Sequence, residues 1–268
     1  MIQAVWGLTM RNLALIGLLI LSVSAFAVDG TRLVVMTYNV EYGAGVDPAE
    51  ARIVERTSNG KRTGNRLRRV ISVIRYVNPD ILGIQEACSW DKNDEAVAKQ
   101  VAKELGMHYY VAKSGQSRFN VALFSKLPIV SAKGFPDKFS RAALQAELGL
   151  PDGRKLVVFV GHFNLLKEKE SQLGEIRYLA GQMKPHSSKL GVMMGDANFR
   201  YGADKECTDA LRASGFAIAP PVGDRIDQIW TSGPLAHDVK EGRKIPAELT
   251  EGTSDHQPTV MVIGIPDK

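Results

Sequence analysis

The chain has 268 residues, of which 44% are hydrophobic and 24% are charged. This balance is typical of a globular protein with one large core or two smaller ones, and it excludes a disordered chain because no long stretch lacks apolar residues. The net charge of +5 is compatible with a polyanionic partner but does not by itself indicate one.

The N-terminal segment has the pattern of a secretory signal. A basic residue precedes an apolar run over residues 13–23, and a small-x-small sequence follows at 24–27. This pattern predicts a signal peptide, residues 1–27, and a secreted or periplasmic protein. The run is short for a bilayer span, which needs about 20 residues. A retained anchor is therefore the alternative, and no membrane span is expected after cleavage. Met10 is an alternative start site.

Residues 28–268 form a single domain by sequence pattern, since no repeat, low-complexity tract or linker divides them. Apolar runs typical of buried strands alternate with stretches whose apolar residues recur at helical spacing. We predict strands over residues 33–38, 81–85, 121–124, 144–148, 156–160, 192–194, 226–230 and 258–263. We predict helices over residues 65–77, 95–105, 168–183 and 208–214. Such alternation favours one α/β sandwich, with two packed sheets and the helices outside.

Polar residues that can bind a metal or transfer a proton follow the apolar runs repeatedly. They are Asn39, Glu86, His162, Asp196, Asn198, Asp227, Asp255 and His256. A polar group directly beyond a buried strand is held rigidly at the rim of the sheet, where catalytic groups are well placed. One such residue alone is better explained as a turn or loop cap. The repeated pattern instead predicts a catalytic site.

Six short segments contain these residues: TYNV (37–40), IQE (84–86), GHFN (161–164), GDAN (195–198), RID (225–227) and SDH (254–256). In these segments and in their order, the chain resembles the DNase I-like endonuclease/exonuclease/phosphatase family over about residues 31–264. The resemblance implies a four-layer α/β/β/α sandwich of two mixed sheets. It also implies a metal-dependent hydrolase that attacks phosphate esters with an activated water. The segment GHFN departs from the family's usual pattern but retains the histidine.

The resemblance implies a metal site at three of these residues. Glu86 is expected to be the main ligand of Mg²⁺ or Mn²⁺, because hard cations prefer carboxylate oxygens. Asn39 is expected to orient Glu86 or to join the metal shell, and an Asx turn is its alternative role. Asp255 is expected at the metal or next to its ligands.

The resemblance also implies roles for the remaining residues. Asp196 and Asn198 would position the attacking water and a phosphoryl oxygen, with turn capping as the alternative. His256 is expected to be the general base or the charged partner of the scissile phosphate, and Asp227 to bind its other ring nitrogen. His162 would donate to a non-bridging phosphate oxygen.

The sequence favours a nuclease, with nucleic acid as its substrate and no stable protein partner. Basic residues gather after the first strand, and these are Arg52, Arg56, Lys61, Arg62, Arg66, Arg68 and Arg69. They can meet a phosphate backbone, and a solvated helix face is the alternative explanation. Arg118 and Arg141 follow loops that can also approach the site. A phosphatase or lipid phosphodiesterase, of the inositol-phosphate or sphingomyelin type, is the alternative function. A noncatalytic binding module is disfavoured because Glu86, Asp196 and His256 are all present.

Of the two cysteines, Cys88 lies two residues beyond Glu86 and Cys207 lies nine residues beyond Asn198. In an exported protein, two cysteines permit only one intrachain pairing. We predict that both lie on the catalytic rim and form a disulfide. Two free buried thiols are the alternative.

Overall fold

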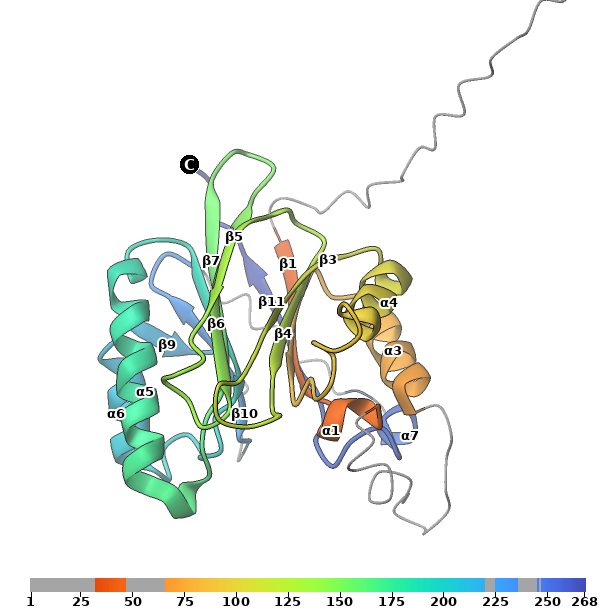
Figure 1. Ribbon diagram of the computed structural model, residues 1–268. Coiled ribbons are helices and arrows are strands. Elements are labelled where there is room, and N and C mark those ends of the chain that lie inside the picture. Colours follow the sequence, from red (N-terminus) through yellow and green to blue (C-terminus); the bar gives the residue numbers. More distant parts are fainter. Residues whose placement is uncertain (1–31, 47–65, 220–224, 236–244, 246) are drawn as a thin grey trace, which may run out of the picture.

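The computed structural model describes residues 32–46, 66–219, 225–235, 245 and 247–268. In these residues two mixed sheets pack face to face, with helices on the outside of each (Figure 1). The predicted four-layer α/β/β/α sandwich is therefore confirmed. The predicted signal peptide lies outside the described residues, as do Arg52, Arg56, Lys61 and Arg62. No helix in the described part of the chain is long and apolar enough to cross a membrane.

The first sheet has the strand order β11-β1-β2-β4-β3. Its strands are β1 (Arg32–Asn39), β2 (Ile81–Gln85), β3 (His108–Ala112), β4 (Val121–Ser125) and β11 (Thr259–Gly264). β1 and β2 run parallel, so their carboxyl ends lie at the same edge of the sheet. The helices of this half are α1 (Glu41–Ala44), α3 (Arg66–Val77), α4 (Ala96–Leu105) and α7 (Ala247–Thr250).

The second sheet has the order β5-β6-β7-β8-β10-β9. Its strands are β5 (Ile129–Gly134), β6 (Ala142–Gly149), β7 (Lys155–His162), β8 (Gly191–Asp196), β9 (Phe216–Ile218) and β10 (Asp227–Ser232). β7 and β8 are its parallel pair. The helical segments of this half are η1 (Leu166–Glu168), α5 (Lys169–Met183), η2 (Lys184–His186) and α6 (Lys205–Arg212).

Buried apolar side chains form three clusters that follow the four layers. One cluster lies between the sheets and includes Val35, Val160 and Met194. A second lies between the first sheet and α3 and α4, and a third between the second sheet and α5 and α6. Because the central strands are buried on both faces, β2 and β8 are continuous apolar runs rather than alternating ones. This burial holds the strand ends, and the polar residues beyond them, in fixed positions.

The predicted elements are all present, with ends that shift by a few residues. α6 begins at Lys205 rather than at residue 208, because the side chain of Asp204 accepts a hydrogen bond from the Cys207 N–H and caps the helix. The strands β3, β5 and β9 were not predicted. β3, β5 and β9 are edge strands, and β5 leaves most of its side chains partly or fully exposed. Such strands lack a buried apolar run.

The predicted disulfide is wrong. Cys88 and Cys207 are both free and buried. Cys88 follows β2 of the first sheet, whereas Cys207 belongs to α6 and packs in the cluster outside the second sheet. Cys207 does not lie on the rim. It belongs to the first turn of α6, which directs its side chain into the cluster outside the second sheet.

Candidate active site

The ends of five strands meet at one rim of the sandwich, at the lower end of both sheets in Figure 1, where α1 follows β1. Asn39 ends β1, and Glu86 directly follows β2. In the second sheet, His162 at the end of β7 is in register with Asp196 at the end of β8. Asp227 begins β10 and is also in register with Asp196, because β10 is antiparallel to β8. The pairing of strands thus accounts for this part of the predicted site.

Asn39 connects the contributions of the two sheets. Its side chain is buried, and its Nδ2 donates to Asp196 Oδ2 at 3.1 Å and to Glu86 Oε1 at 3.3 Å. Its Oδ1 accepts from the Glu41 N–H at 3.0 Å, which is the predicted Asx turn. The structure therefore combines both geometries expected for Asn39, the turn and the contact with Glu86.

A left-handed turn encloses Glu86. Residues of α1 have φ values of 48° at Glu41, 49° at Tyr42, 68° at Gly43 and 57° at Ala44, a conformation that non-glycine residues rarely adopt. The turn directs the Tyr42 N–H to Glu86 Oε2 at 2.9 Å and the Gly43 N–H to the Glu86 carbonyl at 2.7 Å. The strained turn thus places a backbone N–H that holds the Glu86 carboxylate, and the side chain stays partly exposed.

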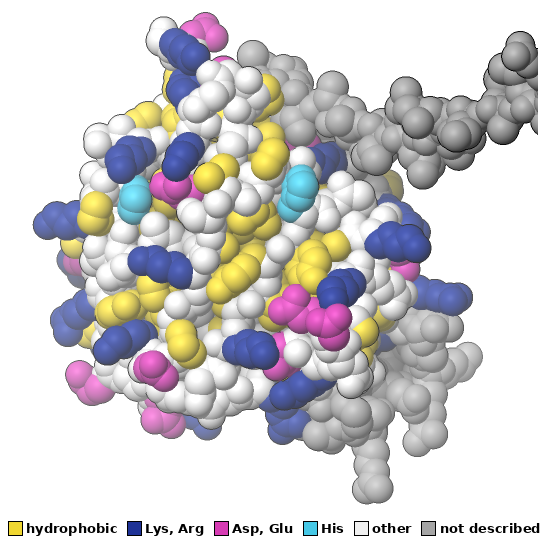
Figure 2. Space-filling view, turned by 45° about the horizontal axis from the view of Figure 1, so that its top comes forward, with side chains coloured by type: hydrophobic (Ala, Val, Ile, Leu, Met, Phe, Trp, Pro, Cys, Tyr) yellow, Lys and Arg dark blue, Asp and Glu magenta, His cyan; other side chains and the backbone are white. Residues whose placement is uncertain are grey.

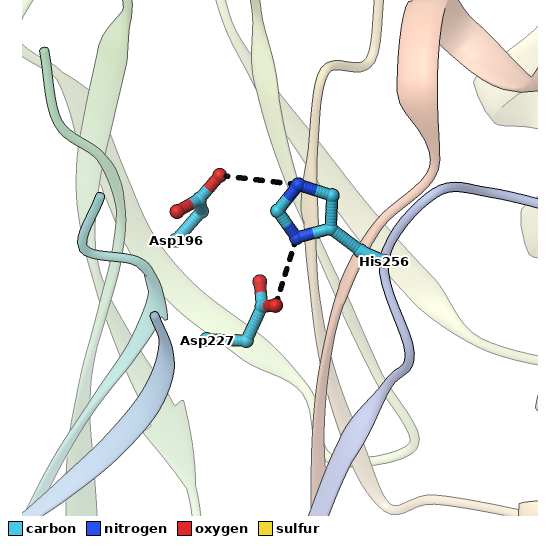
Figure 3. A group of neighbouring side chains, drawn as sticks. All are labelled: Asp196, Asp227 and His256. Atoms are coloured by element: carbon cyan, nitrogen blue, oxygen red, sulfur yellow. Dashed lines mark hydrogen bonds and ion pairs between the residues drawn. The ribbon is translucent and has the colours of Figure 1, made fainter. Parts of the chain in front are cut away.

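His256 lies between two aspartates, as Figure 3 shows. Its Nδ1 is 2.8 Å from Asp227 Oδ2, and its Nε2 is 3.9 Å from Asp196 Oδ2. Ser254 holds the loop before β11, because its hydroxyl donates to the Asn39 carbonyl and accepts from the His256 N–H. The predicted pairing of Asp227 with His256 is present in the structure.

His256, Asp227 and Asp196 shift one another's pKa values. Burial would lower the pKa of His256, but the hydrogen bond to Asp227 and the nearby carboxylates raise it to about 9. Burial raises the pKa of Asp227 to about 6, against the effect of its bond to His256. Burial would also raise the pKa of Asp196, yet contact with His162 and the charge of His256 lower it to about 2. At neutral pH, His256 is therefore a cation between two carboxylates.

His162 lies behind the rim rather than on its surface. It is fully buried, and its Nε2 lies 3.3 Å from Asp196 Oδ2 and 2.7 Å from Arg141 Nη1. Arg141 also donates to the Phe163 carbonyl and lies over the ring of Phe119 at 5.3 Å. A contact of His162 with phosphate stays a prediction. Arg141 is a partly exposed cation at this position, as expected from the loop that precedes it.

Asn198 and Asp255 lie at the margin of the group. The Asn198 N–H donates to Asp196 Oδ1 at 3.0 Å, and its Nδ2 donates to the Phe163 carbonyl at 2.9 Å. The Asp255 side chain is 66% exposed, with Oδ1 4.0 Å from His256 Nε2. Asn198 thus serves as a turn residue, while Asp255 faces solvent beside His256.

Glu41 is a site neighbour that sequence reasoning missed. It is partly buried and forms an ion pair with Arg66 at 2.6 Å. Burial raises the pKa of Glu41, Arg66 lowers it, and the charges of Asp255 and Glu86 raise it further. Its position directly after the TYNV segment, two residues beyond Asn39, was the available signal.

The residues present fit a hard divalent cation. One ligand atom each from Asp196, Asp227 and His256 lies within 4.8 Å of the others. Asp227 Oδ1 is buried without a hydrogen-bond partner among the described residues. No described cation forms an ion pair with Glu86. Carboxylate oxygens suit Mg²⁺ or Mn²⁺ better than a metal that prefers thiolates, and Glu86 offers such oxygens beside this group.

The fold and this rim agree with known proteins. Residues 36–256 match the model of the Endonuclease/Exonuclease/phosphatase family. The chain belongs to this family, whose members are hydrolases that act on phosphoester bonds and generally depend on a divalent metal. No curated protein sequence matches the chain.

Solved structures with the same fold have diverse substrates. The human Nocturnin catalytic domain with bound sulfate is 16% identical, with a TM-score of 0.66 over 87% of this chain and 94% of that chain. TDP2 from D. rerio, complexed with a single-strand DNA product, is 16% identical, with a TM-score of 0.61 over 87% and 98%. A mannosyl-6-phosphatase from Bacteroides thetaiotaomicron is 16% identical, with a TM-score of 0.61 over 86% and 99%. At this identity the likeness shows the fold alone.

Proposed function

We propose that the protein is an exported, Mg²⁺- or Mn²⁺-dependent nuclease that hydrolyses phosphodiester bonds with an activated water. The observation that carries this proposal is the continuous polar group that joins the two sheets. Glu86 and the Asp196–His256–Asp227 group lie on either side of the Asn39 amide, which bonds to both Glu86 and Asp196. This arrangement offers a carboxylate for the cation on one side and a positioned histidine on the other.

Each residue has a step that its geometry supports. Glu86, with Asn39 bonded to it, would hold the cation together with Asp255, the exposed carboxylate beside His256. When bound, the cation would supply charge neutralisation at the phosphoryl oxygens. Asp196, whose pKa is about 2, stays ionised, so it can orient the attacking water by accepting a hydrogen bond from it. Asp196 would then take the proton that the water releases as the new P–O bond forms. Asn198 fixes the Asp196 carboxylate through its N–H.

His256 would act as the charged partner of the scissile phosphate. Its pKa of about 9 means that it carries a proton at neutral pH, so Nε2 can donate to a phosphate oxygen as negative charge develops. Asp227 orients the ring through Nδ1. Arg141 provides a second positive charge on the same side, beside His162.

Nucleic acid is the proposed substrate. The structurally similar TDP2 is described in complex with a single-strand DNA product, which supports the proposal. Lys and Arg side chains are dispersed over the described part of the face in Figure 2 rather than gathered in one stripe. We therefore assign phosphate contacts to the rim, where the partly exposed Arg141 lies beside His162. Arg66 is buried and bonded to Glu41, so it holds the turn instead. The mannosyl-6-phosphatase makes a phosphomonoester the main competing substrate.

The test is a substrate panel on the purified protein with Mg²⁺. The panel contains plasmid DNA, single-stranded DNA, RNA, an inositol phosphate, a sugar phosphate and sphingomyelin. We expect cleavage of a nucleic acid that stops with EDTA and in Asp196→Asn, with Glu170→Gln on the exposed face of α5 as the active control. Hydrolysis of a monoester or lipid alone would overturn the nuclease assignment, and full activity in EDTA would overturn the metal assignment.

Export is tested separately. Expressed with its own leader in a bacterium, the protein should leave the cytoplasm and begin near Val28. Mass spectrometry of the N-terminus decides the question. Recovery of the intact Met1 or Met10 terminus in the membrane fraction would contradict cleavage.

A further inference from the structure

Helix α5 carries two buried polar side chains that none of the roles above uses. Gln172 is 0% exposed and Glu175 is 5% exposed. They lie three residues apart on one face of the helix, among apolar residues of the cluster outside the second sheet. Burying polar groups there is unfavourable unless each is hydrogen-bonded. The positions of their partners therefore show what these side chains do.

Within the described part of the chain, Glu175 bonds to two backbone N–H groups that lie next to or near residues of the site. Its Oε1 accepts from the Ser140 N–H at 2.7 Å, and its Oε2 accepts from the Asn164 N–H at 2.7 Å. Ser140 directly precedes Arg141, and Asn164 lies two residues beyond His162. No described cation forms an ion pair with Glu175. Both oxygens of one carboxylate thus join two separate loops at short distance.

Gln172 adds a third loop to the same group. Its Nε2 lies within hydrogen-bonding distance of the carbonyl oxygens of Asn164 at 2.8 Å, Ala197 at 3.2 Å and Asn198 at 3.2 Å. Ala197 and Asn198 directly follow Asp196. Its Oε1 lies 3.7 Å from the Cys207 thiol. The contacts of Gln172 and Glu175 therefore reach the loops before β6, after β7 and after β8.

We propose that Gln172 and Glu175 are positioning residues that set the geometry of Arg141, His162 and Asp196 from the outer layer of the sandwich. This inference rests on the proposed function only where its test measures kcat and KM. Apolar residues could fill the same volume within the cluster. Strand pairing fixes the ends of β6, β7 and β8, and these hydrogen bonds hold the backbone of the three loops beyond those ends.

The first test is Glu175→Gln, which keeps the size of the side chain but replaces one acceptor oxygen with an NH₂ group. One of the two backbone N–H groups then loses its acceptor. We expect the amides of Ser140 or Asn164 to exchange hydrogen about tenfold faster or more. With bis(p-nitrophenyl) phosphate and Mg²⁺, kcat should fall by about tenfold to a hundredfold at unchanged KM, because a misplacement of about 1 Å has that effect.

Three further variants separate positioning from stability. Gln172→Met, of similar length, should also lower kcat at unchanged KM. Glu170→Gln makes the same chemical change at an exposed position of α5 and should behave as wild type. Met183→Ala opens space at the buried end of α5 and should lower the midpoint of thermal unfolding without lowering kcat.

The outcomes distinguish this inference from the proposed function. Wild-type exchange rates and kcat in Glu175→Gln would overturn the positioning role, as would an equal loss of kcat in Met183→Ala. If the wild-type protein does not hydrolyse the probe, the proposed function fails. The comparison of exchange rates between Glu175→Gln and Glu170→Gln then still decides whether Glu175 holds the loops.

Discussion

The two halves of the rim hold their charges by different means. In the first sheet, the Glu86 carboxylate is partly exposed and is fixed by the Tyr42 N–H and by the Asn39 amide. In the second sheet, Asp196 and Asp227 are buried and are fixed by histidines. A carboxylate without a cationic side chain beside it leaves its charge for an incoming cation. A carboxylate bonded to histidine instead sets the charge state of that histidine.

The largest effect is expected for Asp196→Asn, in the second half. Asp196 contacts Asn39, Asn198, His162 and His256 through its two oxygens. The asparagine keeps the shape but removes the charge, so we expect kcat to fall by about 10²- to 10³-fold, the effect of losing one preorganised polar contact. Raising the Mg²⁺ concentration should not restore it. Activity within a few-fold of wild type would contradict a role for this half in catalysis.

Glu86→Gln, in the first half, should respond to metal. The substitution keeps hydrogen bonding but removes the charge that would hold the cation, so activity should fall by about a hundredfold. Because weaker binding is offset by mass action, increasing Mg²⁺ or Mn²⁺ should restore part of it. Titration of activity against metal concentration is the measurement. A loss that is independent of metal concentration would place the cation elsewhere.

Asp227→Asn tests the electrostatics of the second half. In metal-free protein with a chelator present, NMR titration should show the pKa of His256 falling from about 9 towards its ordinary value of 6.5, because the largest raising influence is removed. Because folding raises the pKa of His256, protonation of this histidine stabilises the folded protein. This contribution is fully present below pH 6.5 and is lost as the pH rises through about 9. That loss of stability should be smaller in the variant. An unchanged His256 titration would refute the pairing.

Gly43→Ala tests the strained turn of the first half and should have the smallest effect. A Cβ at this position would lie 2.3 Å from the Cys88 carbonyl oxygen, and φ is +68°. We expect a loss of about 1–3 kcal/mol in the free energy of unfolding. Gly106→Ala is the matched control, because φ is +66° and nothing lies within 4 Å of the added atom. Equal losses in both variants, measured by urea unfolding, would show that the close contact has no effect.

Sequence reasoning located the strands and the rim because both depend on local pattern. The strand over residues 81–85 was predicted with the bounds that β2 has, since a buried strand between turn residues leaves a continuous apolar run. Asn39 and Glu86 were found because each ends such a run, and strand pairing then brings them together. The rim residues of the second sheet were found in the same way.

What could not be predicted depends on packing or on unusual backbone. The left-handed conformation of Glu41 and Tyr42 has no signal, because these residue types rarely adopt it. The loop before Arg141 was expected near the site, but its contact with His162 depends on the alignment of β6 with β7. The disulfide was predicted from sequence distances that carry no information about layers, and Cys207 proved to belong to the outer one.

The central claim is that the two halves of the rim form one catalytic unit through Asn39, and a double-mutant cycle tests it most directly. Glu86→Gln, Asp196→Asn and the double variant would be compared by kcat/KM on the substrate that the panel identifies, at fixed Mg²⁺. Residues that act as a unit have strongly non-additive effects. We predict that the double variant is no more than a few-fold worse than Asp196→Asn alone. Losses that multiply independently would contradict the account.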